Sequence, residues 1–432
     1  MVLRHFAFLY RAKKASLTLS YIREGNTSKG NHMNTKKNYK KGARKEIIQL
    51  LYQSGVITYR SLRVLPENRR MLGRAVKKLE QERIIEIYLL PKRILFRKTT
   101  PSEIKDIEST ISDAVTTEQR EYYQDKIAKS IYLIRNQYCS PRKKESTRKA
   151  IRLIRDSEIN ALMYSSGATI LAGEKPTHAC SIYPEDAVYY TSSDIKDILI
   201  DSIEISPISK GYLGRGYGLL ISHGGIYQIY HTGDAILKWD SSSELRNAIR
   251  SQRFLRYILN EDYQCPQKIE TAIVIADNNV TLSRMITYEF KTGSWRNAIT
   301  TIQDVYAVLY GITNDLHGRQ LLTIMQYKGW ESLILTSFLS HKEIEESNFC
   351  TIPCDGYDRE KDIYTFVFCK PDLIKFRAFC MRAALENNPT RFRIICFQHQ
   401  LETVANTIEA TCCKVYSIPY DDFISTLGLD YV

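Results

Sequence analysis

Apolar and basic side chains separate onto two faces when residues 67–81 are arranged as a helix. At ~100° per residue, one face holds only apolar side chains, those of Leu72, Ala75, Val76 and Leu79. The opposite face is polar and mostly basic, and it consists of Arg70, Arg74, Lys77, Lys78 and Gln81. The pattern predicts a helix that packs one side onto its neighbours and presents concentrated positive charge on the other.

The residues on either side of this helix complete a pattern of three helices and a hairpin. Residues 44–66 predict two shorter helices before it. Residues 84–90 are rich in β-branched and aromatic side chains, Pro91-Lys92 is typical of a turn, and residues 93–97 return as a second strand. A basic hairpin therefore follows directly after a basic helix.

This order resembles a winged helix-turn-helix domain over residues 44–100. In that family the third helix enters the major groove of DNA, and the hairpin contacts the neighbouring backbone or minor groove. The resemblance implies DNA contacts by the cationic residues of helix and hairpin, namely Arg69, Arg70, Arg74, Lys77, Lys78, Lys92 and Arg93. The alternative is a helix whose basic face is only solvated, as in adaptor domains that bind no DNA.

The charge distribution favours a polyanionic partner for the front of the chain. Residues 1–100 hold 24 Lys and Arg against 6 Asp and Glu, a net +18, whereas the other 332 residues hold 37 against 42, a net −5. Basic side chains that neutralise phosphates release counterions, which drives binding to nucleic acid. No run of ~18 apolar residues and no lipidated anchor is present, so no membrane partner is expected.

Residues 1–43 predict a disordered basic leader. Met33 opens a polar stretch that is typical of a natural start, and its lysines resemble basic arms that follow phosphates, although such tails also serve solubility alone. Ten cysteines are scattered without a tight framework, which indicates reduced thiols in a cytoplasmic protein.

The remaining chain predicts three further regions, in a multidomain protein of the α/β class. Residues 101–166 read as a helical linker, with helices over 118–138 and 146–164 and three adjacent cations at 142–144. Residues 167–265 predict an α+β region with an antiparallel meander, whose strands are 168–171, 187–191, 216–222, 226–230 and 235–239, with a turn at His223-Gly224-Gly225 and a helix over 244–260.

Residues 266–432 predict an α/β domain, in which apolar strands alternate with helices. The expected strands are 269–276, 285–291, 331–338, 363–369, 392–397 and 414–418, and helices are expected at 372–386 and 400–409, with a short closing helix after the last strand. Strands that are apolar on both faces are typical of parallel sheets, so a Rossmann-like or degenerate nuclease-like sheet is expected.

Most motifs for bound cofactors are absent from the sequence. No Gly-Lys-Ser/Thr loop follows a strand, and the glycine cluster at 211–218 precedes a strand where a dinucleotide site would join a strand to a helix. The pairs Cys350/Cys354 and Cys412/Cys413 lack a second pair at zinc spacing, and no His-x-His pair of the kind used by relaxases occurs. No cofactor is therefore expected.

One catalytic alternative is a nuclease. Restriction-type nucleases hold a divalent metal between an acidic residue on one strand and Glu-x-Lys on the next, and Asp277 with Glu289 and Lys291 fits that spacing. Mg²⁺ would be needed only under this hypothesis. A surface Glu/Lys pair at a strand end is the other explanation of the same residues.

The order of elements, with the strand pair at residues 216–233, resembles the replication-relaxation family of plasmid and integrative-element proteins. That resemblance implies a DNA-binding accessory factor in conjugative mobilisation or replication, with double-stranded DNA and a relaxase or replication protein as partners. Winged-helix proteins frequently bind palindromes as homodimers, which is compatible with this chain. A transcriptional regulator whose sheet binds a small ligand is a further alternative.

Overall fold

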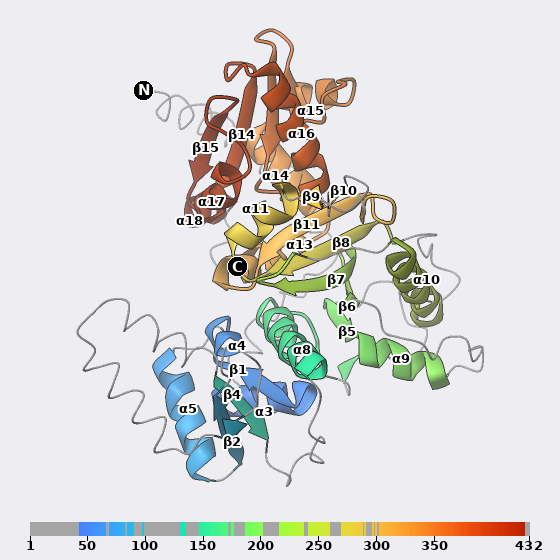
Figure 1. Cartoon of the computed structure of the whole chain (residues 1–432), viewed down its shortest axis with the longest axis vertical. Helices are drawn as coiled ribbons and strands as arrows, with labels where there is room; N and C mark the ends of the chain where they lie inside the picture. The colour runs from blue at the N-terminus through green and yellow to red at the C-terminus, as the bar shows by residue number, and fades with distance from the viewer. Residues whose placement is uncertain are drawn as a thin grey trace, which may run out of the picture. The chain divides into compact units, whose positions relative to one another are not determined.

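The fold is described for much of the chain after residue 42. The computed structural model describes residues 43–65, 69–82, 84–89, 97–98, 130–134, 147–171, 174–176, 186–201, 216–236, 241–259, 269–287, 289–290, 296–297, 299 and 302–427. Helices and strands are both present along the described chain (Figure 1), which confirms the α/β class. None of the described helices is long and apolar enough to cross a bilayer.

Three helices and a hairpin form the first described region, in the predicted order. The elements are α3 (Ala43–Ser54), β1 (Val56–Thr58), α4 (Tyr59–Arg63), α5 (Arg69–Gln81), β2 (Ile85–Leu89) and β3 (Arg97–Lys98). Thr58 caps α4 by accepting a hydrogen bond from the backbone N–H of Ser61. β2 and β3 pair antiparallel, and the turn between them lies outside the described residues.

The predicted helix over residues 118–138 is wrong at its described part, where β4 (Ser130–Ile134) is a strand. β4 pairs antiparallel with both β1 and β2, so the sheet has the order β1-β4-β2-β3. Its sequence, Ser-Ile-Tyr-Leu-Ile, is rich in strand-favouring side chains, and pairing on both sides outweighs the helical spacing of its isoleucines. A fragment that ends at residue 100 would lack this strand.

α8 (Thr147–Ser165) confirms the second predicted linker helix and leads into a five-stranded sheet of order β11-β8-β7-β6-β5. β5 (Val188–Thr191), β6 (Gly216–Ser222) and β7 (Gly225–Gly233) form the predicted antiparallel meander. Two expected strands are not formed where the structure describes them. Residues 168–171 contribute a single bridge from Thr169 to Val188. Ala235 and Ile236 lie past the end of β7 outside any strand, and the rest of the expected strand 235–239 lies outside the described residues.

The same sheet continues beyond the boundary predicted between residues 265 and 266. β8 (Thr271–Ala276) pairs parallel with β7 on one side and with β11 (Val308–Thr313) on the other. Residues on either side of that boundary therefore share one sheet. The carboxyl ends of β7, β8 and β11 meet at one edge because the three strands run in the same direction.

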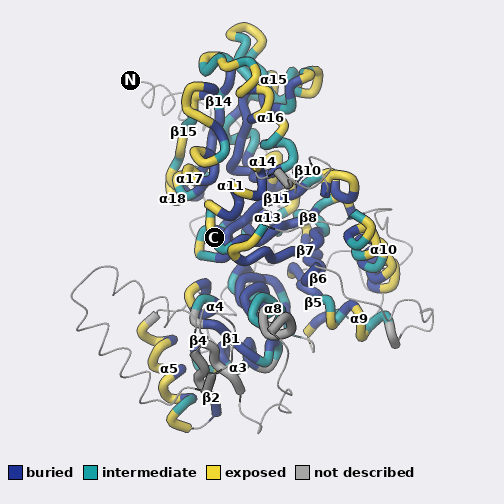
Figure 2. The backbone as a smooth tube through the Cα atoms, viewed as in Figure 1, coloured by how far each residue is buried: buried dark blue, intermediate teal, exposed yellow. Residues whose placement is uncertain are grey.

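Helices cover both faces of the five-stranded sheet. Ile229, Ile273 and Ile312 point to the face that packs with α8 and α13 (Leu316–Met325), whereas Tyr230, Val274 and Leu309 point to the other. The second face packs against α10 (Ser241–Ile258), α11 (Asn279–Thr287) and α16 (Leu373–Glu386). Because successive side chains of each strand point to opposite faces, the sheet contributes to two apolar cores. Figure 2 shows the strands buried and the outer surfaces of the helices exposed.

A second sheet, of order β12-β13-β14-β15, follows in the chain. β13 (Ile363–Val367), β14 (Phe392–Phe397) and β15 (Lys414–Ile418) are parallel, and β12 (Gly356–Asp358) adds an antiparallel edge. The prediction of parallel strands separated by helices is confirmed here. The intervening and closing helices are α16, α17 (Leu401–Ala405) and α18 (Tyr420–Leu427), the first of which is capped by Asp372.

One expected strand in this half of the chain is a helix, and another is helical at its start. Residues 331–338 belong to α14 (Trp330–Phe338), because a short apolar run does not distinguish a strand from a buried helix by its period. Residues 285–287 end α11, and only β9 (Glu289–Phe290) is a strand, paired with β10 (Arg296–Asn297). The other described helices are α9 (Ser192–Asp201) and α15 (His341–Ser347).

Candidate functional site

α5 is divided into a buried and a basic face, as its sequence predicts. Leu72, Val76 and Leu79 are buried in the apolar core that α3 and β2 also line. On the opposite face four cationic residues are exposed, namely Arg70, Arg74, Lys77 and Lys78. Figure 2 shows exposed stretches along α5. We refer to these four residues as the α5 basic face.

The remaining predicted DNA contacts are only partly described. Arg69 is the first residue of α5, but its side chain lies outside the described part of the structure. Lys92 and Arg93 belong to the hairpin turn, which also lies outside it. The structure therefore brings together on one helix face four of the seven predicted residues.

A second group of polar residues gathers where the parallel strands of the five-stranded sheet end. His231 is near the end of β7, Asp277 follows β8, and Asn314 follows β11. Glu158 reaches the same place from α8, and Arg60 reaches it from α4. We call these five residues the carboxyl-edge cluster. Ligands of open α/β sheets bind at this kind of edge.

Arg60 neutralises the acidic side of the cluster. Its Nη1 lies 2.6 Å from Asp277 Oδ1, and its Nη2 donates a hydrogen bond to the backbone oxygen of Asp277 at 3.0 Å. Burial opposes the charge on Arg60, but the carboxylates of Asp277 and Glu158 outweigh burial and raise its pKa. Arg60 is therefore a permanent cation held against two carboxylates.

His231 is fixed in one tautomer by its neighbours. The backbone N–H of Gly233 donates to Nδ1 at 2.9 Å, so Nδ1 has no proton and the neutral ring bears its proton on Nε2. Nε2 lies 3.2 Å from Glu158 Oε2, within ion-pair distance. Asn314 Nδ2 is 3.4 Å from the same Nε2. The ring is fully buried and oriented from both nitrogens.

The cluster includes three residues of metal-binding type, yet its contacts do not fit a metal ion. Glu158, His231 and Asp277 each offer a ligand atom, and these atoms lie within 4.8 Å of one another. A histidine that binds metal through Nε2 donates its Nδ1 proton to an acceptor, whereas here Nδ1 faces the N–H donor of Gly233. The Arg60 guanidinium already supplies positive charge to Asp277. The arrangement is an ion cluster in which Arg60 supplies the positive charge that faces the carboxylates.

The residues of the nuclease hypothesis do not share one described site. Asp277 is in the carboxyl-edge cluster, where its charged partner is Arg60. Glu289 is in β9, whose side chains lie outside the described residues, as does all of Lys291. The pairing of Glu289 and Lys291 with Asp277 therefore stays a prediction.

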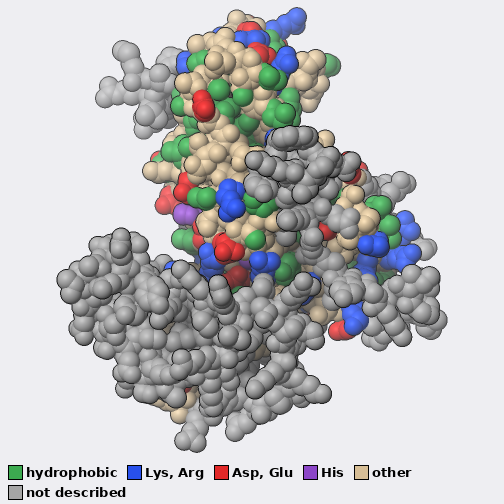
Figure 3. Space-filling view, viewed as in Figure 1, with side chains coloured by type: hydrophobic (Ala, Val, Ile, Leu, Met, Phe, Trp, Pro, Cys, Tyr) green, Lys and Arg blue, Asp and Glu red, His purple; other side chains and the backbone are tan. Residues whose placement is uncertain are grey.

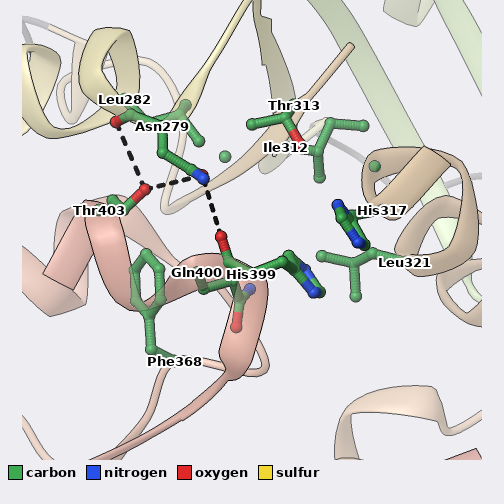
Figure 4. Close-up of a pocket in the computed structure, with 12 residues that line it drawn as sticks. Asn279, Leu282, Ile312, Thr313, His317, Leu321, Phe368, His399, Gln400 and Thr403 are labelled. Carbon is green, nitrogen blue, oxygen red and sulfur yellow. Dashed lines mark hydrogen bonds between the residues drawn. The ribbon is translucent and has the colours of Figure 1, made fainter. Parts of the chain in front are cut away.

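A narrow crevice adjoins the carboxyl-edge cluster, where the ends of β11 and β14 approach each other (Figure 4). Asn279 Nδ2 donates to the backbone oxygen of His399 at 2.8 Å, and Thr403 Oγ1 donates to Asn279 Oδ1 at 3.0 Å. The rings of His317 and His399 stack with centroids 4.3 Å apart. The free space holds about one water molecule, so the crevice is too small for a nucleotide as it stands.

Burial and, to a smaller extent, the neighbouring His317 lower the pKa of His399 to about 4, against the opposing charge of Asp315. His399 is therefore neutral at pH 7. A neutral stacked pair joined to Asn279 and Thr403 locks the two sheets together at this edge. The crevice thus has a clear structural role in the described arrangement.

Sequence reasoning found the α5 basic face and missed most of the carboxyl-edge cluster. The sequence singles out Asp277 for its place after a strand, but Arg60, Glu158 and His231 have no motif, because the cluster joins distant parts of the chain. Arg60 and Asp277 alone are 217 residues apart. A His in a strand next to a small turn offers no signal by itself. In comparisons with known proteins, no family model, no curated protein and no solved structure matches this chain.

Proposed function

We propose that this chain binds double-stranded DNA, with α5 in the major groove and the β2–β3 hairpin beside it. The observation that carries the proposal is the α5 basic face, four exposed cations on a helix whose other side is buried. A helix of this build can lie in the major groove, which admits an α-helix, while its arginines and lysines contact phosphates and base edges.

The position of the cations within α5 supports a binding role over a purely structural one. Arg69 and Arg70 are in the first turn of the helix, which contains no acidic residue. Positive charge at a helix N-terminus opposes the helix dipole and costs about 0.3–1 kcal/mol per charge. Helix stability would favour Asp or Glu there, so the basic first turn is better explained by an anionic partner.

The packing of α5 against its neighbours holds the helix in a fixed orientation. Leu72 and Leu79 anchor it in the core, and β2 begins four residues after it and pairs with both β3 and β4. Since a helix with a buried apolar stripe has a fixed rotation about its axis, the cations keep their outward direction. A rigid presentation reduces the entropy lost on binding.

The role of an accessory factor in conjugative mobilisation or replication extends this proposal through the family resemblance alone. Under that extension, the α/β body docks a relaxase or a replication protein. The nuclease alternative gains no support from the carboxyl-edge cluster, because Arg60 already neutralises Asp277 and the tautomer of His231 disfavours a metal.

The test is fluorescence-anisotropy binding of the full chain to duplex DNA from its own gene neighbourhood and to scrambled duplex, over a salt series. The variant R70A/R74A/K77A removes three cations of the α5 basic face. We expect its affinity to fall by about two orders of magnitude or more and the slope of log K against log salt to flatten by about 2–3, because each phosphate contact contributes about 0.9.

A matched control removes three exposed cations elsewhere. R359A/R382A/K414A changes net charge by the same amount on exposed positions around the second sheet, and its affinity should stay within about threefold of the parent. Thermal unfolding of both variants verifies that they fold. If the α5 variant binds as tightly as the control, the proposal is wrong. Equal affinity for native and scrambled duplex would leave a DNA-binding protein without site preference.

A further inference from the structure

α10 displays a second basic surface, on a helix that the sequence analysis predicts over residues 244–260 without assigning it a function. The exposed side of α10 holds Arg246, Arg253 and Arg256, with the half-buried Arg250 beside them. At 100° per residue, the four arginines span an arc of ~120° on the side opposite the buried residues. Figure 3 shows Lys and Arg side chains gathered over this helix.

The single acidic residue of α10 does not neutralise this surface. Glu244 is fully buried under the helix, where its Oε2 accepts hydrogen bonds from Tyr230 Oη at 2.7 Å and from Asn247 Nδ2 at 3.1 Å. Arg246 donates to Ser243 Oγ, an uncharged group of the same helix. Among the described residues, Arg253 and Arg256 form no ion pair. The charge is therefore available to a partner.

Apolar side chains are interleaved with the arginines. Leu245 is 49% exposed, Ile249 46% and Tyr257 36%. Large apolar groups that remain exposed beside a charged stripe are typical of a contact surface. Arginine is also the cation best suited to phosphate, because its planar fork forms paired hydrogen bonds.

We propose that the exposed face of α10, with Arg246, Arg253 and Arg256, is a second DNA-contacting surface that binds the phosphate backbone of a duplex held by the α5 basic face. The inference rests on the proposed function for its choice of partner. Arg246 and Arg256 are ten residues apart, or ~15 Å along the helix at 1.5 Å per residue. Duplex DNA presents one phosphate per ~3.4 Å on each strand, so several lie within that length.

The surface would add affinity without adding sequence preference. Contacts to phosphate position a protein on DNA, whereas base edges specify the sequence. The α10 face should therefore matter for a long duplex that extends beyond the segment bound by α5, and little for a short one. This difference separates its role from that of α5.

The test compares R246A/R253A/R256A with the α5 variant R70A/R74A/K77A and with the control R359A/R382A/K414A, all in the full chain. Each is titrated with a duplex of about one helical turn (~10 bp) and one of about four turns. We expect the α10 variant to bind the long duplex about tenfold or more weakly, with a salt slope lower by about 2–3, and the short duplex within about threefold of the parent.

Replacement of the same three arginines by lysine checks the mechanism and the fold together. R246K/R253K/R256K keeps the positive charge, so it should recover most of the affinity for long duplex if phosphates are the partner. Thermal unfolding of the alanine variant should match that of the control, since all three side chains are exposed.

The outcomes separate this inference from the proposed function. If the α10 variant matches the control on both duplexes while the α5 variant loses binding, the inference is wrong and the proposed function stands. If the α10 variant loses binding and the α5 variant does not, the proposed function fails, and with it the inference that the α10 face adds contacts to a duplex held by α5. Loss of binding to phosphatidylserine vesicles with unchanged DNA affinity would assign the surface to membranes and overturn the inference.

Discussion

Arginines in two successive helices have opposite surroundings. Arg60 of α4 lies against Asp277 and Glu158 at the edge of a sheet, and its side chain is only 34% exposed. Arg74 of α5, fourteen residues later, stands on an exposed face of a helix that has no acid in its first turn. Arg60 is paired with acidic residues of the same chain, whereas the exposed cations of α5 can contact a binding partner.

Burial and pairing therefore distinguish cations that stabilise the fold from cations that are available for binding. A paired arginine in a partly buried site is needed by its acids, so its removal affects stability. An exposed cation contributes little to stability, so its removal affects binding alone. Each of the following predictions changes one side of this comparison.

The largest stability effect is expected at the pair of Arg60 and Asp277. R60A leaves two carboxylates without their cation, and D277A leaves the guanidinium without its closest acid. Each should lower the free energy of unfolding by about 1–3 kcal/mol, less than for a fully buried pair because both side chains are partly exposed. Chemical denaturation of the full chain measures this loss.

The double variant R60A/D277A tests the interaction itself. Its loss should be smaller than the sum of the two single losses by about 1 kcal/mol. R74A is the matched control from the α5 basic face and should change stability by less than about 0.5 kcal/mol. Equal effects of R60A and R74A on stability, or a change in the salt slope of DNA binding by R60A, would remove the contrast between the two helices.

A smaller effect is expected from pH, through His399 at the neighbouring crevice. Its pKa is about 4 in the folded protein because burial disfavours the imidazolium, against an ordinary value of 6.5. In the unfolded chain His399 is protonated below about pH 6.5, whereas in the folded protein it is protonated only below about pH 4. Folding stability therefore falls as pH decreases through this window, by up to about 2 kcal/mol at pH 5.

The variant H399Q isolates this contribution. It has no group that titrates in the window, so the difference in unfolding free energy between pH 7 and pH 5 should shrink by about 2 kcal/mol relative to the parent. Titrating groups that do not interact with His399 are common to both proteins and cancel in the comparison. An identical pH dependence in the two proteins would mean that His399 is protonated as readily in the folded state as in the unfolded one.

The two regions also differ in how far sequence predicts them. The α5 basic face follows from residues three and four apart in one helix, so a 15-residue window contains the whole pattern. Arg60 and Asp277 meet only because β8 and α4 approach each other in the fold, and nothing in the spacing of 217 residues encodes that contact. The helical spacing of residues within one segment predicts the α5 basic face, whereas the carboxyl-edge cluster depends on tertiary packing.

The wrong element assignments have the same origin. Residues 130–134 read as helix by spacing, but the pairing of β4 with β1 and β2 makes them a strand. Residues 331–338 read as strand by composition, but they form α14, whose Trp330 and Ile334 are buried one turn apart. In both segments the apolar run is too short to fix its own period, and packing partners that are remote in sequence decide the outcome.

The smallest expected effect, at Gly73, examines the α5 basic face most directly. Gly73 is exposed in the interior of α5, between Arg70 and Arg74, and a Cβ added there would meet nothing within 4 Å. Gly costs a helix interior roughly 0.5–1 kcal/mol relative to Ala, so G73A should raise the unfolding free energy by about that amount. Denaturation measures this gain, and the salt slope of DNA binding should stay unchanged because no charge is altered. A gain in stability combined with a tenfold loss of affinity would show that the backbone of α5 approaches DNA so closely at Gly73 that a methyl group obstructs it, which would place this turn of the helix deepest in the groove.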